Sequence, residues 1–186
     1  MPYTIGPDGY LDFSRCANDD EKIDQCWDYY REHLADVDIV AADGKSVRGF
    51  TEETFTHIIS GSSNRFDPAL DHDIDFVEHR ARALPLIAKA ISGALTSRVY
   101  RISHDRYGKT VVRRNLVVIE VGYEYFVVVL DELKGKYRIR TAFPSSEDYV
   151  NKRIRALGIS AGIWGGEQSE MPRIPGSEAG PVINSR

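Results

Sequence analysis

Cysteine and long apolar runs are both scarce in this 186-residue chain. Two cysteines, Cys16 and Cys26, are too few for a zinc site and make an unconvincing disulfide framework, so we expect reduced thiols in a cytosolic protein. No run approaches the roughly 20 apolar residues that span a bilayer. The first residues also lack the cationic segment and apolar core of a signal peptide. We therefore expect a cytoplasmic protein with no membrane attachment.

What the chain does contain is typical of a globular protein, with 42% hydrophobic and 28% charged residues. The net charge of −4 conceals a strong asymmetry. Residues 1–97 hold 9 Lys/Arg and 18 Asp/Glu, whereas residues 98–158 hold 13 Lys/Arg and 7 Asp/Glu. A basic segment in an acidic protein indicates a local anionic ligand. The pI of about 5.7 argues against general coating of DNA.

Helical signals dominate the first half of the chain. Acidic residues open a predicted helix over 19–35, and Thr51 is the expected N-cap of a second helix that ends at Gly61. Asp67-Pro68 predicts the start of a third helix, which continues through Val77. Pro85 begins or kinks a further segment that closes at Ser92-Gly93. Residues 37–49 contain a turn signal between short β-like pieces.

The hydrophobic period changes to two after these helices. We expect strands over 98–104, 110–114, 116–121, 123–130 and 137–143, then a last helix that starts at Ser145 or Ser146 and stops at Gly158. This order predicts an α+β fold, with N-terminal helices packed on one face of a twisted four- to five-stranded antiparallel sheet and a C-terminal helix. The expected units are an extension (1–49), a main domain (50–158) and a flexible tail (159–186).

Two short motifs resemble a known family. The segment His57-Ile-Ile-Ser-Gly61 followed by Arg65-Phe-Asp-Pro68, and the later run Tyr137-Arg-Ile-Arg-Thr141-Ala-Phe-Pro144, are similar to the ends of domains in the barnase–EndoU–colicin–RelE ribonuclease superfamily, in its phage- and polymorphic-toxin-associated branch. The likeness covers roughly residues 50–157. It implies a metal-independent endoribonuclease in which a ribose 2′-hydroxyl attacks the adjacent phosphate, with no cofactor.

Such a reaction needs groups that transfer protons and cations that stabilise the phosphorane. The resemblance implies His57, Arg65, Thr141 and Tyr137 as catalytic residues. Each also has an ordinary structural explanation. A histidine near a helix C-terminus is favourable without any catalysis. Arg65 could form a surface ion pair, and threonine is common in strands.

Arg101, Arg113, Arg138 and Arg140 are the candidate substrate-binding residues. Strict alternation along a strand puts Arg138 and Arg140 on the face opposite Tyr137 and Thr141, so both sets cannot face one ligand in a regular strand. The sequence leaves this conflict open. Arg101 and Arg113 could equally be solvated or edge charges.

No metal site is expected. His72 and His79 share a helical face, but two turns separate them by about 10 Å, and no HExxH signature is present.

Two functions remain in competition. The first is an endoribonuclease, a toxin or a phage or mobile-element effector acting on RNA such as a tRNA. For it we expect either a neutralising antitoxin or immunity protein, or inhibition by the acidic N-terminal half folding against the basic sheet. The second is a non-catalytic RNA- or protein-binding module with the same fold, favoured by the aspartates that follow the histidine. A small-molecule enzyme ranks last. The oligomeric state is left open.

Overall fold

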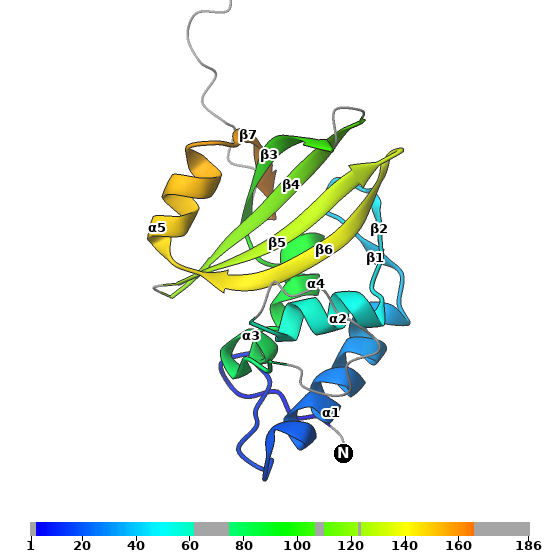
Figure 1. The fold of residues 1–186 in the computed structure, drawn as a ribbon, viewed down its shortest axis with the longest axis vertical. Coiled ribbons are helices and arrows are strands. Elements are labelled where there is room, and N and C mark those ends of the chain that lie inside the picture. Colours follow the sequence, from blue (N-terminus) through cyan, green and yellow to red (C-terminus); the bar gives the residue numbers. More distant parts are fainter. Residues whose placement is uncertain (1–2, 62–74, 107–109, 123, 166–186) are drawn as a thin grey trace, which may run out of the picture.

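A computed structural model describes residues 3–61, 75–106, 110–122 and 124–165 (Figure 1). Within these residues, one seven-stranded sheet is combined with short helices, so the α+β class is confirmed. The strands are β1 (Ile39–Val40), β2 (Ser46–Arg48), β3 (Ser97–Arg106), β4 (Thr110–Val121), β5 (Glu124–Leu133), β6 (Lys136–Ser145) and β7 (Ile159–Trp164). The helices are α1 (Asp19–Tyr30), α2 (Glu52–Ile59), α3 (Glu78–Arg82), α4 (Pro85–Ser92) and α5 (Glu147–Tyr149), with π-helical turns η1 (Arg31–Ala35) and η2 (Val150–Arg155).

Capping residues set the ends of the main helices. The Asn18 side chain accepts a hydrogen bond from the backbone N–H of Glu21 at the start of α1. Thr51 does the same for the N–H of Thr54 at the start of α2. α4 begins with Pro85 and ends at Gly93, whose φ of 78° is the left-handed conformation that suits glycine. These boundaries agree with the sequence signals.

The third predicted helix does not extend as far as expected. Most of that helix lies outside the described residues, as does Arg65. Residues 75–77 are not helical, and Phe76 instead forms an isolated antiparallel bridge with Ser60. The helical signal of this region resumes only in α3.

The sheet is larger than predicted and is not purely antiparallel. Its strand order is β1-β2-β6-β5-β4-β3-β7. β3 to β6 form the expected meander, but residues 110–121 are one strand instead of two. β2 pairs in parallel with β6, and β7, which we had placed in the tail, pairs with β3. Short or weakly alternating strands such as β2 and β7 carry little periodic signal, so their pairing partners cannot be inferred from sequence.

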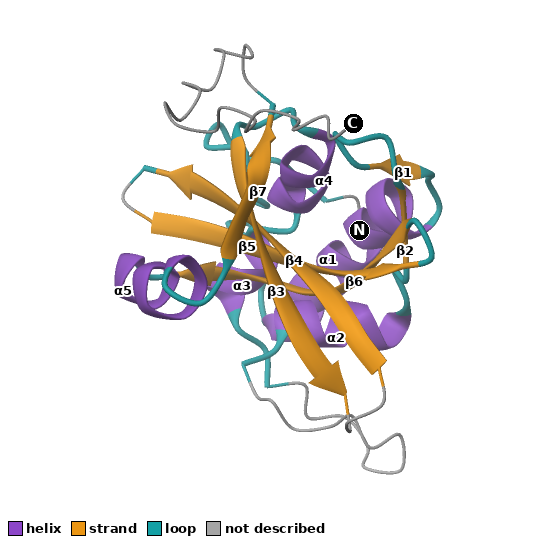
Figure 2. Cartoon of the chain, turned by 90° about the horizontal axis from the view of Figure 1, so that it is seen from above, coloured by secondary structure: helices purple, strands orange, loops and turns teal. Residues whose placement is uncertain are grey.

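The sheet curls around α4, which packs against β1 near one edge and β7 at the other (Figure 2). As a result the Tyr137 ring on β6 lies 5.9 Å from the Trp164 ring on β7, centroid to centroid, although three strands separate β6 from β7 in the sheet. Gly93 and Gly165 also meet so closely that a Cβ on Gly165 would lie 2.1 Å from the Gly93 carbonyl oxygen. This contact requires glycine.

Two hydrophobic cores lie on opposite faces of the sheet. The larger one joins residues of α1, α2, α3 and α4 to the inner face of the curl, and it includes Leu11 and Phe13 from the first residues of the chain. The smaller one packs Val150 and Ile154 of η2 on the other face, against strand residues such as Val118 and Val127. The C-terminal helix is therefore on the face opposite the N-terminal helices. It covers only part of that face and leaves room for a cavity.

Candidate functional site

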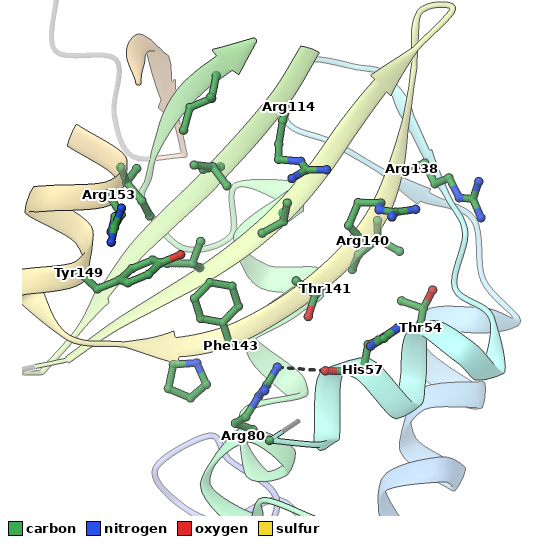
Figure 3. Close-up of a pocket in the computed structure, with 18 of the residues that line it drawn as sticks. Thr54, His57, Arg80, Arg114, Arg138, Arg140, Thr141, Phe143, Tyr149 and Arg153 are labelled. Atoms are coloured by element: carbon green, nitrogen blue, oxygen red, sulfur yellow. Dashed lines mark hydrogen bonds between the residues drawn. The ribbon is translucent and has the colours of Figure 1, made fainter. Parts of the chain in front are cut away.

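A cavity of about 700 Å³ opens on the face of the sheet that η2 covers in part (Figure 3). α2 and the start of α3 form one wall, and α5 with η2 forms the other. Strands β3 to β6 provide the floor. Its lining includes five arginines and one histidine against a single glutamate: Arg80, Arg114, Arg138, Arg140, Arg153, His57 and Glu53. This imbalance of charge makes the lining basic, which favours an anionic ligand over a cationic one.

His57 projects from α2 into this cavity. The Thr51 cap fixes where the helix starts, so His57 falls in the last turn, one helical turn after Glu53. The His57 Nε2 atom lies 3.9 Å from Glu53 Oε1, and both side chains line the cavity. With 35% of its side chain exposed, the imidazole is accessible to a ligand. An imidazole beside a carboxylate can exchange protons with a bound substrate.

Arg80 of α3 holds the end of α2 in place. Its guanidinium donates hydrogen bonds to the carbonyl oxygens of His57, at 3.0 Å, and Ser60. The guanidinium carbon also lies 6.0 Å from the centroid of the Phe143 ring on β6. Burial lowers the pKa of Arg80, although a guanidinium remains charged. Arg80 thereby ties the His57 helix to the floor of the cavity.

Asp131 on β5 binds two of the cavity's arginines. Its Oδ1 accepts from Arg114 Nε on β4 at 2.9 Å, and its Oδ2 lies 3.4 Å from Arg140 Nε on β6. Asp131 is only 8% exposed, whereas the side chains of Arg114 and Arg140 are 31% and 40% exposed. One carboxylate thus orients two guanidinium groups and leaves their remaining N–H donors open to the cavity.

A β-bulge in β6 resolves the conflict left open by the sequence. Val129 pairs with Thr141 and Leu130 pairs with Ile139, so Arg140 is an extra residue in the strand. Because of this insertion, Arg138, Arg140 and Thr141 all line the same cavity. The Thr141 side chain and these two arginines therefore share the lining of one cavity.

The far end of the cavity is aromatic. Tyr149 stands at the start of the C-terminal helical segment, and its ring meets the Phe143 ring edge to face at a centroid distance of 5.9 Å. Tyr149 is 44% exposed. Arg153, one helical turn further on, lines the same end.

Tyr137 does not contribute to the cavity, which corrects our expectation for it. It is 2% exposed in the larger core, on the other face of the sheet. Its hydroxyl donates to Asp43 Oδ2 at 2.7 Å and accepts from Lys45 Nζ at 3.2 Å. Burial, reinforced by the Asp43 carboxylate, raises the pKa of Tyr137 to about 12. Thr141 of the predicted segment does line the cavity, but the bulge at Arg140 separates it from Tyr137.

Arg101 and Arg113 are likewise outside the cavity. Arg101 Nε donates to Asn115 Oδ1 at 3.3 Å and its Nη2 lies 3.8 Å from Glu132. Arg113 is exposed and lies beside Arg114 on β4, so its side chain points to the opposite face. Arg65 falls outside the described residues. Of the eight predicted site residues, the structure brings together His57, Arg138, Arg140 and Thr141.

Arg114, which the sequence suggests as an RNA contact together with Arg113, lines the cavity. Several other lining residues were not predicted, namely Glu53, Arg80, Tyr149 and Arg153. Two of them had a signal in the sequence. Glu53 precedes His57 by four residues and Arg153 follows Tyr149 by four, and both spacings put the pair on one helical face. Arg80 had none, because its role depends on the packing of α3 against α2.

No three His, Cys, Asp or Glu side chains within the described part of the chain are grouped so that they could hold a metal ion. In the same residues, no helix is both long and apolar enough to cross a membrane. Cys16 and Cys26 are free thiols.

Comparisons with protein-family models, with curated proteins and with solved structures gave no match for this chain.

Proposed function

We propose that this protein is an endoribonuclease that cleaves RNA without a metal ion. The observation that carries the proposal is the convergence of His57 with Arg114, Arg140 and Thr141 around one open cavity. Guanidinium groups match the oxygens of a phosphate, and imidazole titrates close to neutral pH. A proton-transfer group facing a phosphate site is what cleavage of a phosphodiester requires.

In this mechanism the ribose 2′-oxygen forms a bond to phosphorus while the bond from phosphorus to the 5′-oxygen breaks. The 2′-proton passes to one group and the leaving 5′-oxygen takes a proton from another. Glu53 and His57, 3.9 Å apart on α2, are the pair to which we assign these transfers. Arg114 and Arg140 stabilise the negative charge of the phosphorane, and the Thr141 hydroxyl donates a hydrogen bond to one of its oxygens. The product is a 2′,3′-cyclic phosphate.

A non-catalytic anion-binding module is the alternative, and the Asp131 contacts favour it. A buried carboxylate that already neutralises part of the charge on Arg114 and Arg140 weakens their attraction for a second anion. In a binding module the Asp131 carboxylate would limit affinity, whereas in an enzyme it would orient the two guanidinium groups. The two functions are distinguished by whether bound RNA is cleaved.

Cleavage of a fluorescently labelled RNA by the wild type and by His57→Ala tests the proposal. We expect the rate to fall about 10²- to 10⁴-fold, which is the usual effect of removing a general acid or base. His79→Ala is the matched control, because His79 is an exposed histidine that does not line this cavity. EDTA should leave the rate unchanged, and the products should carry cyclic phosphate ends.

Equal cleavage by the wild type and His57→Ala would remove His57 from the mechanism. Loss of cleavage in EDTA would exclude the metal-free reaction. RNA binding that weakens with salt but never leads to turnover would establish the binding module instead.

A further inference from the structure

The cavity has two chemically different halves. Around His57, Arg114 and Arg140 it is basic. Towards α5 and η2 the lining becomes apolar and aromatic, with Ile102, Leu116, Val127, Phe143, Tyr149 and Ile154. Figure 3 shows Phe143 between Thr141, at the basic half, and Tyr149. A ligand that fills the whole cavity therefore needs an anionic part next to a flat apolar part.

Tyr149 is not buried in the core, unlike its apolar neighbours on the same helical segment. Val150 and Ile154, its neighbours on the same helical segment, are fully or almost fully buried in the smaller core. Tyr149 stays 44% exposed at the cavity, and its hydroxyl has no hydrogen-bond partner among the described residues. The Phe143 ring supports it edge to face, at an interplanar angle of 83°, so this contact covers at most one face of the Tyr149 ring. A supported ring with a free face is suited to stacking.

We propose that the Phe143–Tyr149 end of the cavity is a nucleobase subsite, and that the substrate is RNA with an unpaired nucleotide at the cleavage position. The inference rests on the proposed function and adds the class of RNA to it. A nucleotide supplies the required combination, because its phosphate is anionic and its base is flat and aromatic. The base has to leave a duplex to reach Tyr149, so single strands, loops and bulges are accepted and continuous duplexes are not.

Arg153 extends the subsite. It lines the aromatic end one helical turn from Tyr149, on the wall opposite His57 and Arg80. A strand whose base stacks on Tyr149 brings its neighbouring phosphate towards this guanidinium. The arginines on both sides of the aromatic pair therefore fit successive phosphates of one strand.

The test measures binding of a strand that cannot be cleaved. The probe is a short fluorescein-labelled single-stranded DNA, whose sugars lack the attacking 2′-hydroxyl, and fluorescence anisotropy gives its affinity for the full chain. We expect Tyr149→Ala to weaken binding about 5- to 150-fold, the range for loss of one base-stacking aromatic ring. Tyr149→Phe, which keeps the aromatic ring, should restore most of the affinity that Tyr149→Ala loses. Lys152→Ala is the control, because Lys152 is 72% exposed on the same helical segment and pairs with Asp148.

A second measurement uses the wild type alone. An abasic site at the stacked position should weaken binding as much as Tyr149→Ala does, and the two changes together should cost no more than either one. Binding of the duplex form should be weaker than that of the single strand. Unchanged binding by Tyr149→Ala, an abasic probe that binds like the intact strand, or a preference for duplex would each overturn the subsite.

These outcomes separate the subsite from the proposed function. If the protein cleaves RNA but Tyr149→Ala binds the DNA probe normally, the subsite is wrong and the ribonuclease stands. If binding depends on Tyr149 but natural RNA is never cleaved, the endoribonuclease is wrong and the cavity is a binding site for single strands.

Discussion

Two polar clusters occupy opposite faces of the same sheet, and they differ in how their charges are balanced. On the cavity face, Arg114 and Arg140 share the single carboxylate of Asp131, and further arginines stand nearby without a carboxylate of their own in the lining. On the inner face, Lys45 lies within 3.3 Å of both Asp43 and Glu132. The cluster on the cavity face has an excess of cations, whereas in the cluster on the inner face the cations are matched by carboxylates.

The inner cluster has the contacts of a structural network. Its hydrogen bonds connect the turn between β1 and β2 to β5 and β6, across segments far apart in the chain. The pKa of Glu132 and that of Asp43 are both lowered despite burial, because Lys45 and, for Asp43, the Tyr137 hydroxyl stabilise the ionised forms. The charges of Lys45, Asp43 and Glu132 offset one another, although the buried Glu132 Oε2 atom has no hydrogen-bond partner among the described residues. Charge imbalance, and not burial of polar groups, therefore distinguishes the site.

The largest expected effect comes from removing the orienting pair on the cavity face. We expect the Arg114→Gln, Arg140→Gln double variant to weaken RNA binding at least about 100-fold, since hydrogen bonds to charged groups contribute about 1.5–3 kcal/mol each. Arg113→Ala is the matched control, because Arg113 is the exposed neighbour of Arg114 on the other face. Filter binding at fixed salt measures both. Equal losses in Arg113→Ala and in the single variants Arg114→Gln and Arg140→Gln would show that only total charge matters.

Arg138→Ala tests the contribution of a cavity arginine to binding without destabilising the fold. The Arg138 side chain is exposed and makes no ion pair with Asp131 or with any other residue that the structure describes, so its loss leaves no buried carboxylate unpaired. We expect it to weaken binding about 10-fold with no change in urea stability.

Alkaline pH is expected to destabilise the inner cluster. The pKa of Tyr137 is raised from 10.0 to about 12 in the folded protein, so the folded state keeps a proton that the unfolded state releases. Stability from this shift is fully present below pH 10 and falls as pH rises towards 12, by roughly 2–3 kcal/mol in total. Urea unfolding of the wild type and Tyr137→Phe across this range measures it. The other tyrosines titrate in both proteins, so a constant difference between the two would contradict the shift.

The smallest effect should be that of Tyr137→Phe at neutral pH. The variant loses the hydrogen bonds to Asp43 and Lys45 but keeps the buried ring, and we expect a loss of about 1 kcal/mol in the free energy of unfolding. RNA binding and cleavage should not change, because Tyr137 lies on the face away from the cavity. If the variant folds normally but cleaves RNA more slowly, Tyr137 contributes to catalysis after all.

The sequence was sufficient for features that depend on local chemistry. Thr51 and Gly93 mark helix ends through capping and backbone freedom, and both act as expected. The meander of β3 to β6 follows from period-two patterns and turn residues. The excess of Lys/Arg over residues 98–158 also predicted a basic surface, and four of the five cavity arginines come from this segment.

Features that depend on pairing were beyond the sequence. Nothing in Arg138-Ile139-Arg140-Thr141 announces a bulge, because the extra residue is defined by the partner strand and not by its own identity. For the same reason Tyr137 and Thr141, which alternation puts on one face, lie on opposite faces. The hydrogen bonds from Arg80 to α2 depend on how α3 packs against α2, so they cannot be predicted from the sequence.

The parallel pairing of β2 with β6 also has a consequence for the order in which the molecule assembles. Val47 pairs with Tyr137, about 90 residues later, whereas β3 to β6 pair through consecutive short turns. Contacts between residues near in sequence form sooner, because less chain entropy is lost in closing the loop. The meander is therefore expected to form first, and the segment that carries His57 to dock afterwards. During synthesis that segment leaves the ribosome well before the strands it needs, so we expect a nascent chain to lack a complete cavity until β6, α5 and η2 have emerged.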